Sequence, residues 1–186
     1  MYTHNKMIGA KKDFCFEEFT AISFINLNKQ ETELVRKWRN HQNIRKWMCS
    51  QEIISPKRHF DFIRGLRDDK KIFYWLLKHK DKEYLGVIYL SRLDKVNKNA
   101  YLGIYKDPFA KVAGVGSSLI KYLINIAFRI MELHTLKLEV LEDNEKAIKF
   151  YRKCGFSQEG TLKEFIFRDG KWLNAVVMGI INQKKL

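Results

Sequence analysis

The sequence predicts a single domain of the α+β class, with a mixed, mostly antiparallel central sheet of about seven strands flanked by helices. Its 186 residues match the length of one domain, and 46% of them are hydrophobic, which is enough for a sizeable core. Three apolar runs in the first half follow one another across short charged connections, a pattern typical of an antiparallel meander. In the second half, strand patterns alternate with helix patterns. We expect residues 1–15 to form a flexible segment and residues 16–186 to form the domain.

The first half is expected to begin with a strand and two short helices. Residues 21–27 form an apolar run rich in strand-forming residues. From Glu31 onward apolar residues recur at helical spacing, and Ser55 before Pro56 supplies the N-cap and first-turn proline expected where a helix starts. The three strands of the meander are then expected at residues 72–77, 84–90 and 100–105.

The second half is expected to contain two helices, a strand and a hairpin. Val115, Leu119 and Leu123 fall on one face of a long helix. A strand at residues 136–141 and a shorter helix follow it. The hairpin is expected at residues 164–167 and 172–180, around Asp169 and Gly170, a dipeptide that favours a tight turn.

Charge and cysteine content limit the partners, the kinds of site and the cellular compartment that we expect. The chain carries 35 Lys and Arg against 21 Asp and Glu, a formal net charge of +14, which favours anionic partners such as nucleic acid, acidic lipid or phosphorylated small molecules. The cysteines are widely spaced, without a CxxC pair or a His cluster, so neither a disulfide framework nor a metal site is expected. No apolar stretch reaches the roughly 20 residues of a membrane span. We therefore expect a cytoplasmic protein that makes no membrane contact.

A glycine-containing loop opens the long helix. Residues 111–117 read Lys-Val-Ala-Gly-Val-Gly-Ser. Glycines let the backbone approach a ligand, and the free N–H groups of a helix N-terminus suit a phosphate. The loop is not a Walker motif, and it fails the dinucleotide fingerprint because Leu119 stands at the third glycine position. By itself it is as compatible with an ordinary helix start as with phosphate binding.

A second segment makes the pattern specific. It runs from Asn144 to Phe156 and follows the spacing NxxAxxxYxxxGF. With the loop, which follows (Q/R)xxGxG/A except for a lysine at its first position, it resembles the two hallmark segments of the GNAT superfamily of N-acetyltransferases. The resemblance covers roughly residues 20–180 and implies a three-layer fold with acetyl-CoA as the acetyl donor and no metal. It implies donor contacts from Ile104, Tyr105, Lys111, Val112, Ala113, Gly114, Val115, Gly116, Ser117, Asn144, Ala147, Phe150 and Tyr151.

The same resemblance suggests catalytic groups. Tyr151 is the candidate general acid, because collapse of the tetrahedral intermediate expels a thiolate that a phenol can protonate. Without the resemblance, a tyrosine on an apolar helix face would be interpreted as core. Glu139 is the candidate acceptor of the amine proton through water, since strand alternation turns it away from the apolar face. Tyr89 and Ser91 are weaker candidates for holding that water, and Asn144 suits both an N-cap and a contact to the pantetheine arm.

Two short segments bear on the acceptor. Residues 38–41, Trp-Arg-Asn-His, and 46–48, Lys-Trp-Met, resemble the superfamily members that acetylate UDP-4-amino-4,6-dideoxy-N-acetylhexosamines of the altrosamine type in pseudaminic acid biosynthesis, the route to flagellin glycosylation. The implied partner is a small nucleotide sugar. The implied acceptor contacts are Arg39, Met48, His59, Phe62, Tyr101 and Glu139, of which Met48, Phe62 and Tyr101 suit either an apolar wall or the core.

Other functions stay open at this point. Similar Trp-Arg-Asn segments occur in acetyltransferases that act on protein N-termini, ribosomal proteins and polyamines. A basic nucleic-acid-binding module is the alternative from a different class. It is disfavoured because the Lys and Arg residues are dispersed and no aromatic RNA-binding signature is present, so we expect no nucleic-acid partner. A homodimer is compatible with the sequence.

Overall fold

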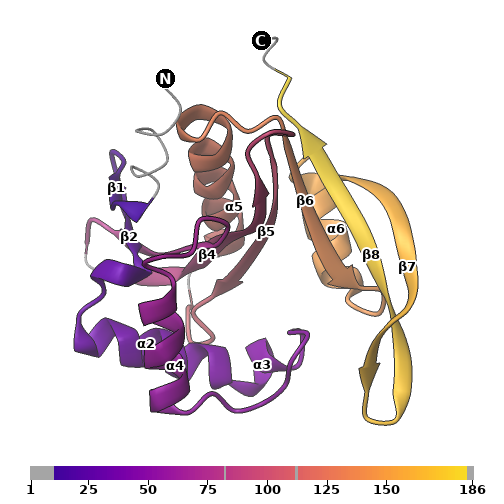
Figure 1. Ribbon diagram of the computed structural model, residues 1–186, viewed down its shortest axis with the longest axis horizontal. Helices are drawn as coiled ribbons and strands as arrows, with labels where there is room; N and C mark the ends of the chain where they lie inside the picture. Colours follow the sequence, from indigo (N-terminus) through magenta and orange to yellow (C-terminus); the bar gives the residue numbers. More distant parts are fainter. Residues whose placement is uncertain (1–10, 82, 112, 184–186) are drawn as a thin grey trace.

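The computed structural model describes residues 11–81, 83–111 and 113–183. Its strands are β1 (Phe14–Cys15), β2 (Phe19–Ser23), β3 (Phe73–His79), β4 (Tyr84–Asp94), β5 (Asn99–Lys106), β6 (Thr135–Leu141), β7 (Ser157–Arg168) and β8 (Lys171–Ile181). They form one eight-stranded sheet in the order β1-β2-β3-β4-β5-β6-β8-β7 (Figure 1). Only β5 and β6 pair in parallel. The predicted mixed, mostly antiparallel sheet is confirmed, with one strand more than expected.

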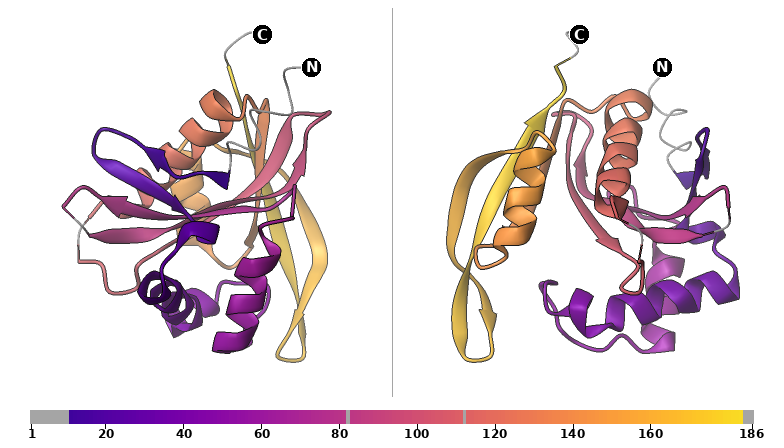
Figure 2. Two further views of the ribbon diagram at one scale, coloured as in Figure 1. Left: turned by 60° about the vertical axis from the view of Figure 1, so that its left-hand side comes forward. Right: turned by 180° about the vertical axis from the view of Figure 1, so that it is seen from behind.

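Helices cover both faces of the sheet and complete three layers (Figure 2). The helices α2 (Lys29–Asn40), α3 (Gln42–Arg45) and α4 (Pro56–Gly65) lie on one face, with the short turn η2 (Phe24–Asn26). The other face carries α5 (Val115–Asn125), its π-helical continuation η3 (Ile126–Ile130) and α6 (Glu145–Lys153). Each face has its own core cluster, one around Trp38 and Leu76 and one around Leu90 and Leu119. No helix within the described residues is long and apolar enough to cross a lipid bilayer.

Local sequence signals fix the helix starts on the first face. Asn28 and Glu31 form a capping box, in which each side chain accepts from the other residue's backbone N–H, at 2.9 and 3.0 Å. Ser55 caps α4 with Pro56 in the first turn, as predicted. Caps of this kind stabilise a helix by about 1 kcal/mol each. They therefore fix where α2 and α4 begin beneath the sheet.

The N-terminal part of the sheet differs from the expectation. The strand expected at residues 21–27 runs instead over Phe19–Ser23 and gives way to η2. The cause is Asp13, whose carboxylate accepts from the backbone N–H of Ser23 at 2.8 Å and from the Asn26 side chain at 2.9 Å. Residues 11–15, the described part of the segment expected to be flexible, are attached to the domain because Phe14 and Cys15 pair with β2.

The C-terminal hairpin is longer than predicted. Its strands reach from Ser157 to Arg168 and from Lys171 to Ile181, whereas the sequence indicated only residues 164–167 and 172–180. The predicted turn is confirmed, with Asp169 and Gly170 both at positive φ. The first part of β7 was missed because its side chains are mostly exposed and carry no apolar alternation.

The parallel pair β5 and β6 separates after a short contact. Only Asn99 to Tyr101 pair with Thr135 to Lys137, yet β5 continues to Lys106 and β6 to Leu141. Beyond the contact, the facing edges of the two strands have no partner strand in the described sheet (Figure 1). Backbone N–H and C=O groups need a hydrogen-bonding partner when they are removed from water. The split therefore offers a row of main-chain groups to a ligand.

Candidate active site

The glycine loop places an open helix end beside the split. Gly114 is the N-cap of α5 at φ +80, and no side chain caps the helix there. Added to Gly114, a Cβ would meet nothing within 4 Å, so the approach to the first N–H groups of α5 is open. Such groups, at the positive end of a helix dipole, suit a phosphate. The predicted contact Val112 lies outside the described residues. The side chain of Val115 is buried in the core, so only its backbone N–H can contact a ligand.

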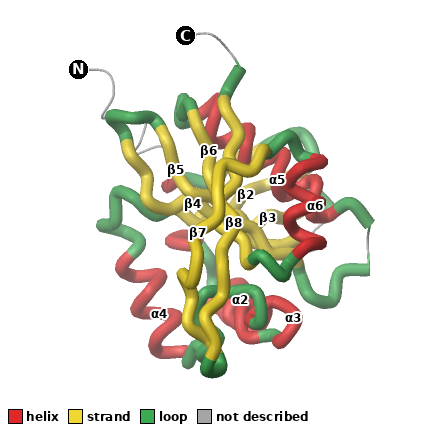
Figure 3. The backbone as a smooth tube through the Cα atoms, turned by 90° about the vertical axis from the view of Figure 1, so that its right-hand side faces the viewer, coloured by secondary structure: helices red, strands yellow, loops and turns green. Residues whose placement is uncertain are grey.

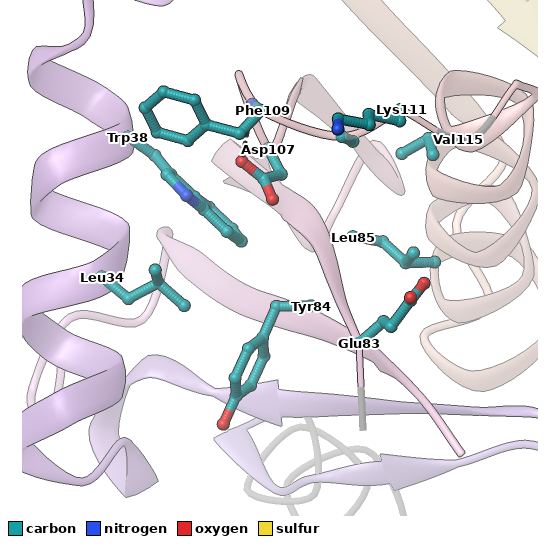
Figure 4. A pocket seen from close by; sticks show the side chains of 10 residues that line it. Leu34, Trp38, Glu83, Tyr84, Leu85, Asp107, Phe109, Lys111 and Val115 are labelled. Carbon is teal, nitrogen blue, oxygen red and sulfur yellow. Dashed lines mark hydrogen bonds between the residues drawn. The ribbon is translucent and has the colours of Figure 1, made fainter. Parts of the chain in front are cut away.

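The far side of this loop is hollowed as well (Figure 4). This cavity of about 440 Å³ carries the carboxylates of Glu83 and Asp107 as well as Lys111. Asp107 accepts from the backbone N–H of Phe109 at 2.9 Å, which fixes the turn leaving β5. Two carboxylates oppose an anionic ligand. A phosphate is therefore better placed at the α5 amides than in this hollow.

The second sequence segment supplies a tyrosine next to the split. Asn144 caps α6 by accepting from the N–H of Ala147 at 3.3 Å, so its N-cap role is confirmed, and its side-chain NH₂ has no acceptor among the described residues. Tyr151 is 8% exposed and packs against the rings of Phe150 and Phe156, at 5.2 and 5.6 Å. Burial raises the pKa of the Tyr151 phenol, and the nearby phenol of Tyr89 raises it further. The hydroxyl therefore keeps its proton at neutral pH and is available as a donor.

Tyr89 covers part of β5 on the face of the sheet that carries α2 and α4. It stands opposite Gly103 in the register of β4 and β5, and a Cβ on Gly103 would lie 2.0 Å from the Tyr89 ring. The ring therefore lies across β5, where any larger residue would displace it. Its other neighbour is Tyr74, stacked at 4.6 Å. Gly103 was not identified from the sequence, although a glycine inside a strand is a signal of close approach.

A second cavity lies on the α2 and α4 face, and we call it the acceptor-side pocket. Its volume is about 350 Å³. It brings together four of the predicted acceptor contacts, Arg39, Met48, His59 and Phe62. The other two predicted contacts, Tyr101 and Glu139, are not part of its lining. The Arg92 guanidinium covers the Tyr101 ring at 4.4 Å. Residues that the sequence did not indicate complete the wall: Phe24, Cys49, Ser50, Ile54, Arg58 and Tyr74.

The predicted donor contacts on β5 divide between the two faces. Ile104 packs against the core cluster under α5, whereas Tyr105 points to the other face and lines the acceptor-side pocket. Side chains alternate along a strand, so neighbours cannot share a face. Tyr105 can therefore reach a donor in the split only through its backbone, and its ring belongs to the acceptor side.

Arg39 is the main charged group inside the acceptor-side pocket. Its Nη2 donates to the carbonyl of Ser50 at 2.8 Å, while its Nη1 is buried without a hydrogen-bond partner among the described residues. Burial lowers the Arg39 pKa, though a guanidinium remains charged at neutral pH. Arg58, also in the lining, is ion-paired to Glu52. No carboxylate belongs to the lining that the described residues form. The pocket therefore favours a neutral or anionic ligand.

The remaining polar groups of the pocket are uncharged. His59 is 5% exposed, and burial together with the charge of Arg36 lowers its pKa to about 4, so it is neutral at pH 7. Burial raises the pKa values of the Tyr74, Tyr89 and Tyr105 phenols. The aromatic rings offer apolar contact, and Arg39 is the guanidinium in the lining that has no ion-pair partner among the described residues.

Glu139 lies where strand alternation predicted it, on the face opposite the buried Leu136 and Leu138. Its carboxylate is 15% exposed and accepts from both Nη atoms of Arg92, at 2.6 and 3.2 Å. Arg92 occupies a β-bulge and has φ +51, which the sequence did not reveal. Ser91, partly exposed, stands opposite Tyr101. Any proton that Glu139 accepts must therefore reach an oxygen that Arg92 already engages.

The described residues contain no group of three or more side chains suited to hold a metal ion. The groups that the structure brings together are thus an open helix end, a split between strands and a protonated tyrosine on one face. On the other face they are a carboxylate and an aromatic pocket lined by the guanidinium groups of Arg39 and Arg58. Tyr89 lies on this second face and is close enough to Tyr151 to raise the pKa of its phenol. This arrangement suits transfer of an acyl group held in the split to an acceptor held in the pocket.

Comparisons with known proteins agree with this arrangement. Residues 32–156 match the model of the acetyltransferase (GNAT) family. The acetyltransferase PseH of Campylobacter jejuni is 35% identical over 145 residues, which cover 78% of this chain and 88% of that protein. The spermidine N(1)-acetyltransferase of Vibrio cholerae is 25% identical over 164 residues, covering 86% and 92%. The Vibrio cholerae spermidine N-acetyltransferase structure with CoA and spermine superposes with a TM-score of 0.82, at 22% identity and 91% and 98% coverage.

Proposed function

Since the chain belongs to the acetyltransferase (GNAT) family and is an acetyl-CoA-dependent N-acetyltransferase, we propose that its acceptor is the 4-amino group of a UDP-4-amino-4,6-dideoxy-N-acetylhexosamine of the altrosamine type. The product would serve pseudaminic acid biosynthesis and flagellin glycosylation. The observation that carries the proposal is the acceptor-side pocket, which holds a guanidinium, neutral rings and no carboxylate among its described lining residues. The 35% identity to PseH supports the same acceptor class.

The donor is proposed to lie in the split between β5 and β6. Its pyrophosphate accepts from the N–H groups at the start of α5, where Gly114 leaves room for the backbone to approach. The amides of the pantetheine arm pair with the unpaired edges of β5 and β6, much as an added strand would. The free NH₂ of Asn144 contributes a further donor.

The reaction is proposed to proceed by direct attack of the acceptor amine on the thioester. The amine attacks only when neutral, so Glu139 accepts its proton through a water, with Tyr89 and Ser91 as groups on the same face that hold this water. The tetrahedral intermediate then collapses, the C–S bond breaks and Tyr151 gives its phenolic proton to the departing thiolate. These residues supply the acid and base functions from the protein itself.

The acceptor sugar is proposed to enter the acceptor-side pocket. Met48 and Phe62 form an apolar contact for its deoxy edge, and Arg39 and His59 face its oxygen atoms. Tyr101 instead packs its ring against the Arg92 guanidinium, which binds Glu139. The net charge of +14 attracts the diphosphate of a nucleotide sugar from solution.

A polyamine is the second candidate acceptor, because the spermidine N(1)-acetyltransferase of Vibrio cholerae also matches over most of the chain. A polyamine carries several positive charges, and the guanidinium of Arg39 repels them. Recognition of a polycation would need carboxylates in the wall of the pocket. The pocket chemistry therefore favours the sugar, and the same field disfavours the basic surface of a ribosomal protein.

A cytoplasmic location is proposed with this activity. Acetyl-CoA and nucleotide sugars are cytoplasmic metabolites, and the three cysteines are free thiols, as expected in a reducing compartment.

The proposal is tested by mass spectrometry of a matched acceptor panel with acetyl-CoA in excess. The panel contains UDP-4-amino-4,6-dideoxy sugars, spermidine, spermine and peptides with free N-termini. We expect a UDP-amino-sugar to gain the mass of one acetyl group fastest, with NMR placing the group on N4. Faster acetylation of a polyamine or peptide than of every UDP-amino-sugar would refute the acceptor while leaving the acetyltransferase activity in place.

A further inference from the structure

The wall of the acceptor-side pocket includes the chain between α3 and α4. Residues 48–50 and 54 of this segment line the pocket. Its far end is held by α2, since Asn40 exchanges two hydrogen bonds with the backbone of Ile54, at 2.8 and 2.9 Å. Arg39 holds its middle through the Ser50 carbonyl at 2.8 Å. Both anchors come from the same half of the sheet as the segment itself.

The near end of this segment is held from the opposite half of the molecule. Arg168, the last residue of β7, donates from Nη1 to the carbonyl of Lys46 at 2.9 Å and from Nη2 to the carbonyl of Met48 at 2.6 Å. With its side-chain amide turned so that both atoms are satisfied, Gln51 also accepts from Nε of Arg168 at 3.3 Å. The partners are 122 and 120 residues apart in sequence. Figure 3 shows the turn of the β7 and β8 hairpin close to this segment.

The position of Arg168 is itself well defined. It pairs with Lys171 across a two-residue turn in which Asp169 and Gly170 both have positive φ. A guanidinium that bonds two carbonyls at once is held in one orientation by its planar geometry. Arg168 therefore fixes the backbone of residues 46–48 relative to the turn of the hairpin.

These bonds join the two halves of the sheet that diverge at the split, where we propose that the donor binds. The two halves of the sheet are joined through β5 and β6 only from Asn99 to Tyr101, beyond which the strands diverge. Arg168 belongs to the half with β6, β8 and β7, and its acceptors belong to the half with α2 to α4. It thus ties the two halves together away from their point of contact.

We propose that Arg168 is a positioning residue, which holds the outer wall of the acceptor-side pocket and thereby sets its fit to the acceptor. The inference rests on the proposed function in so far as the pocket is the acceptor site. It assigns Arg168 no contact with the reacting atoms. Loss of its bonds to the Lys46 and Met48 carbonyls and to the Gln51 side chain frees residues 46–51 at one end, while the bonds to α2 remain.

Two measurements on Arg168→Met test this, with Lys171→Met as a matched control from the facing position of the hairpin, which has no hydrogen bond to the segment. In hydrogen exchange without acceptor, we expect the backbone amides of residues 46–51 to exchange at least about fivefold faster in Arg168→Met only. In kinetics, we expect the acceptor KM to rise about tenfold, while kcat and the acetyl-CoA Kd stay within about twofold. Arg168→Lys should recover part of the KM, because an ammonium can reach one carbonyl.

Several results would overturn the inference. Unchanged exchange at residues 46–51, an unchanged acceptor KM, or an equal loss of acetyl-CoA affinity would each do so, the last because it indicates general destabilisation. Equal changes in amide exchange and in acceptor KM in Lys171→Met would also overturn it. The exchange measurement needs no acceptor, so it decides whether Arg168 holds the segment even if no UDP-amino-sugar is turned over, an outcome that counts against the proposed function.

Discussion

The split between β5 and β6, where we propose that the donor binds, and the acceptor-side pocket on the α2 and α4 face are built from different groups. The donor side offers main-chain groups: the open N-terminus of α5 and the unpaired edges of β5 and β6. The acceptor side offers side chains, among them Arg39, His59 and Tyr89, drawn from α2, α4 and β4. A site made of main-chain groups depends on the conformation of the backbone. A site made of side chains depends also on which residues the fold brings together.

This difference explains how one scaffold can serve several acceptors. Relatives named for spermidine and for L-amino acids both match this chain, and the solved structure of a spermidine N-acetyltransferase shares this fold at a TM-score of 0.82. Changes in a few side chains of the acceptor-side pocket alter its charge without moving the backbone that receives the donor. Substitutions on the two sides should therefore change different properties, such as acetyl-CoA affinity, turnover or stability.

The largest effect is expected at Tyr151, the proposed general acid. Tyr151→Phe removes only the hydroxyl and should lower kcat about 10²-fold while leaving the Kd of acetyl-CoA nearly unchanged. Rapid-quench kinetics and calorimetry measure the two quantities. Tyr122→Phe, which alters a ring packed against Phe16 and Phe19, is the control and should keep normal turnover. Wild-type kcat in Tyr151→Phe, with chemistry limiting the rate, would exclude the acid role.

The second effect concerns the acceptor side and its buried histidine. The folded-state pKa of His59 is about 4, below the ordinary 6.5, so the unfolded chain takes up this proton first as the pH falls. The contribution of the neutral His59 to the free energy of unfolding is fully present above pH 6.5. It decreases by about 1 to 2 kcal/mol, after allowance for solvent screening, as the pH falls to 4. Urea unfolding at several pH values should show this loss in the wild type and a smaller one in His59→Asn.

The exposed His134 provides the control for that measurement. His134→Asn should keep the full dependence of unfolding free energy on pH. If His59→Asn shows the same slope as the wild type between pH 6.5 and 4, the histidine is not held neutral by burial.

The third effect tests the main-chain character of the donor side. Gly114→Val should weaken acetyl-CoA binding at least about tenfold, or about 1.4 kcal/mol, because a branched side chain is strained at φ +80 and would crowd the pyrophosphate. Gly160→Val, at an open position of β7 where φ is not positive, is the matched control. Normal acetyl-CoA affinity of a folded Gly114→Val variant in calorimetry would remove this site.

The smallest effect is expected where the two sides meet. Glu139→Gln keeps the shape of the side chain and removes its basicity, so kcat/KM at neutral pH should fall about fivefold. Activity should recover in part at higher pH, because more of the acceptor amine is then already deprotonated. The exposed Glu164→Gln serves as control. A pH profile parallel to that of the wild type would assign Glu139 to holding Arg92 in place.

The contrast between the two sides also marks what could be predicted from the sequence. The glycine loop and the segment from Asn144 to Phe156 were enough to predict the family, because the motifs of both are formed by neighbouring residues. Alternation along β6 placed Glu139 on the correct face, because that rule is local too. Tyr105 was assigned to the donor by position in sequence, although its ring faces the acceptor.

The features that were not predicted depend on contacts between distant parts of the chain. Arg92 reaches Glu139 only because a β-bulge alters its direction, and Arg168 meets Lys46 across 122 residues. Asp13 ends β2 by binding Ser23. None of these contacts leaves a periodic or spaced signal in the sequence, so pattern reasoning has nothing to detect there.

The central claim is that the acceptor-side pocket, with its guanidinium and no carboxylate in its described lining, selects a nucleotide sugar over a polyamine. The most direct test is the ratio of kcat/KM for a UDP-4-amino-4,6-dideoxy sugar to that for spermidine, with both acceptors in one reaction. We predict a ratio above about 10² that decreases as salt screens the attraction of the diphosphate. A ratio below one at every salt concentration would contradict the account.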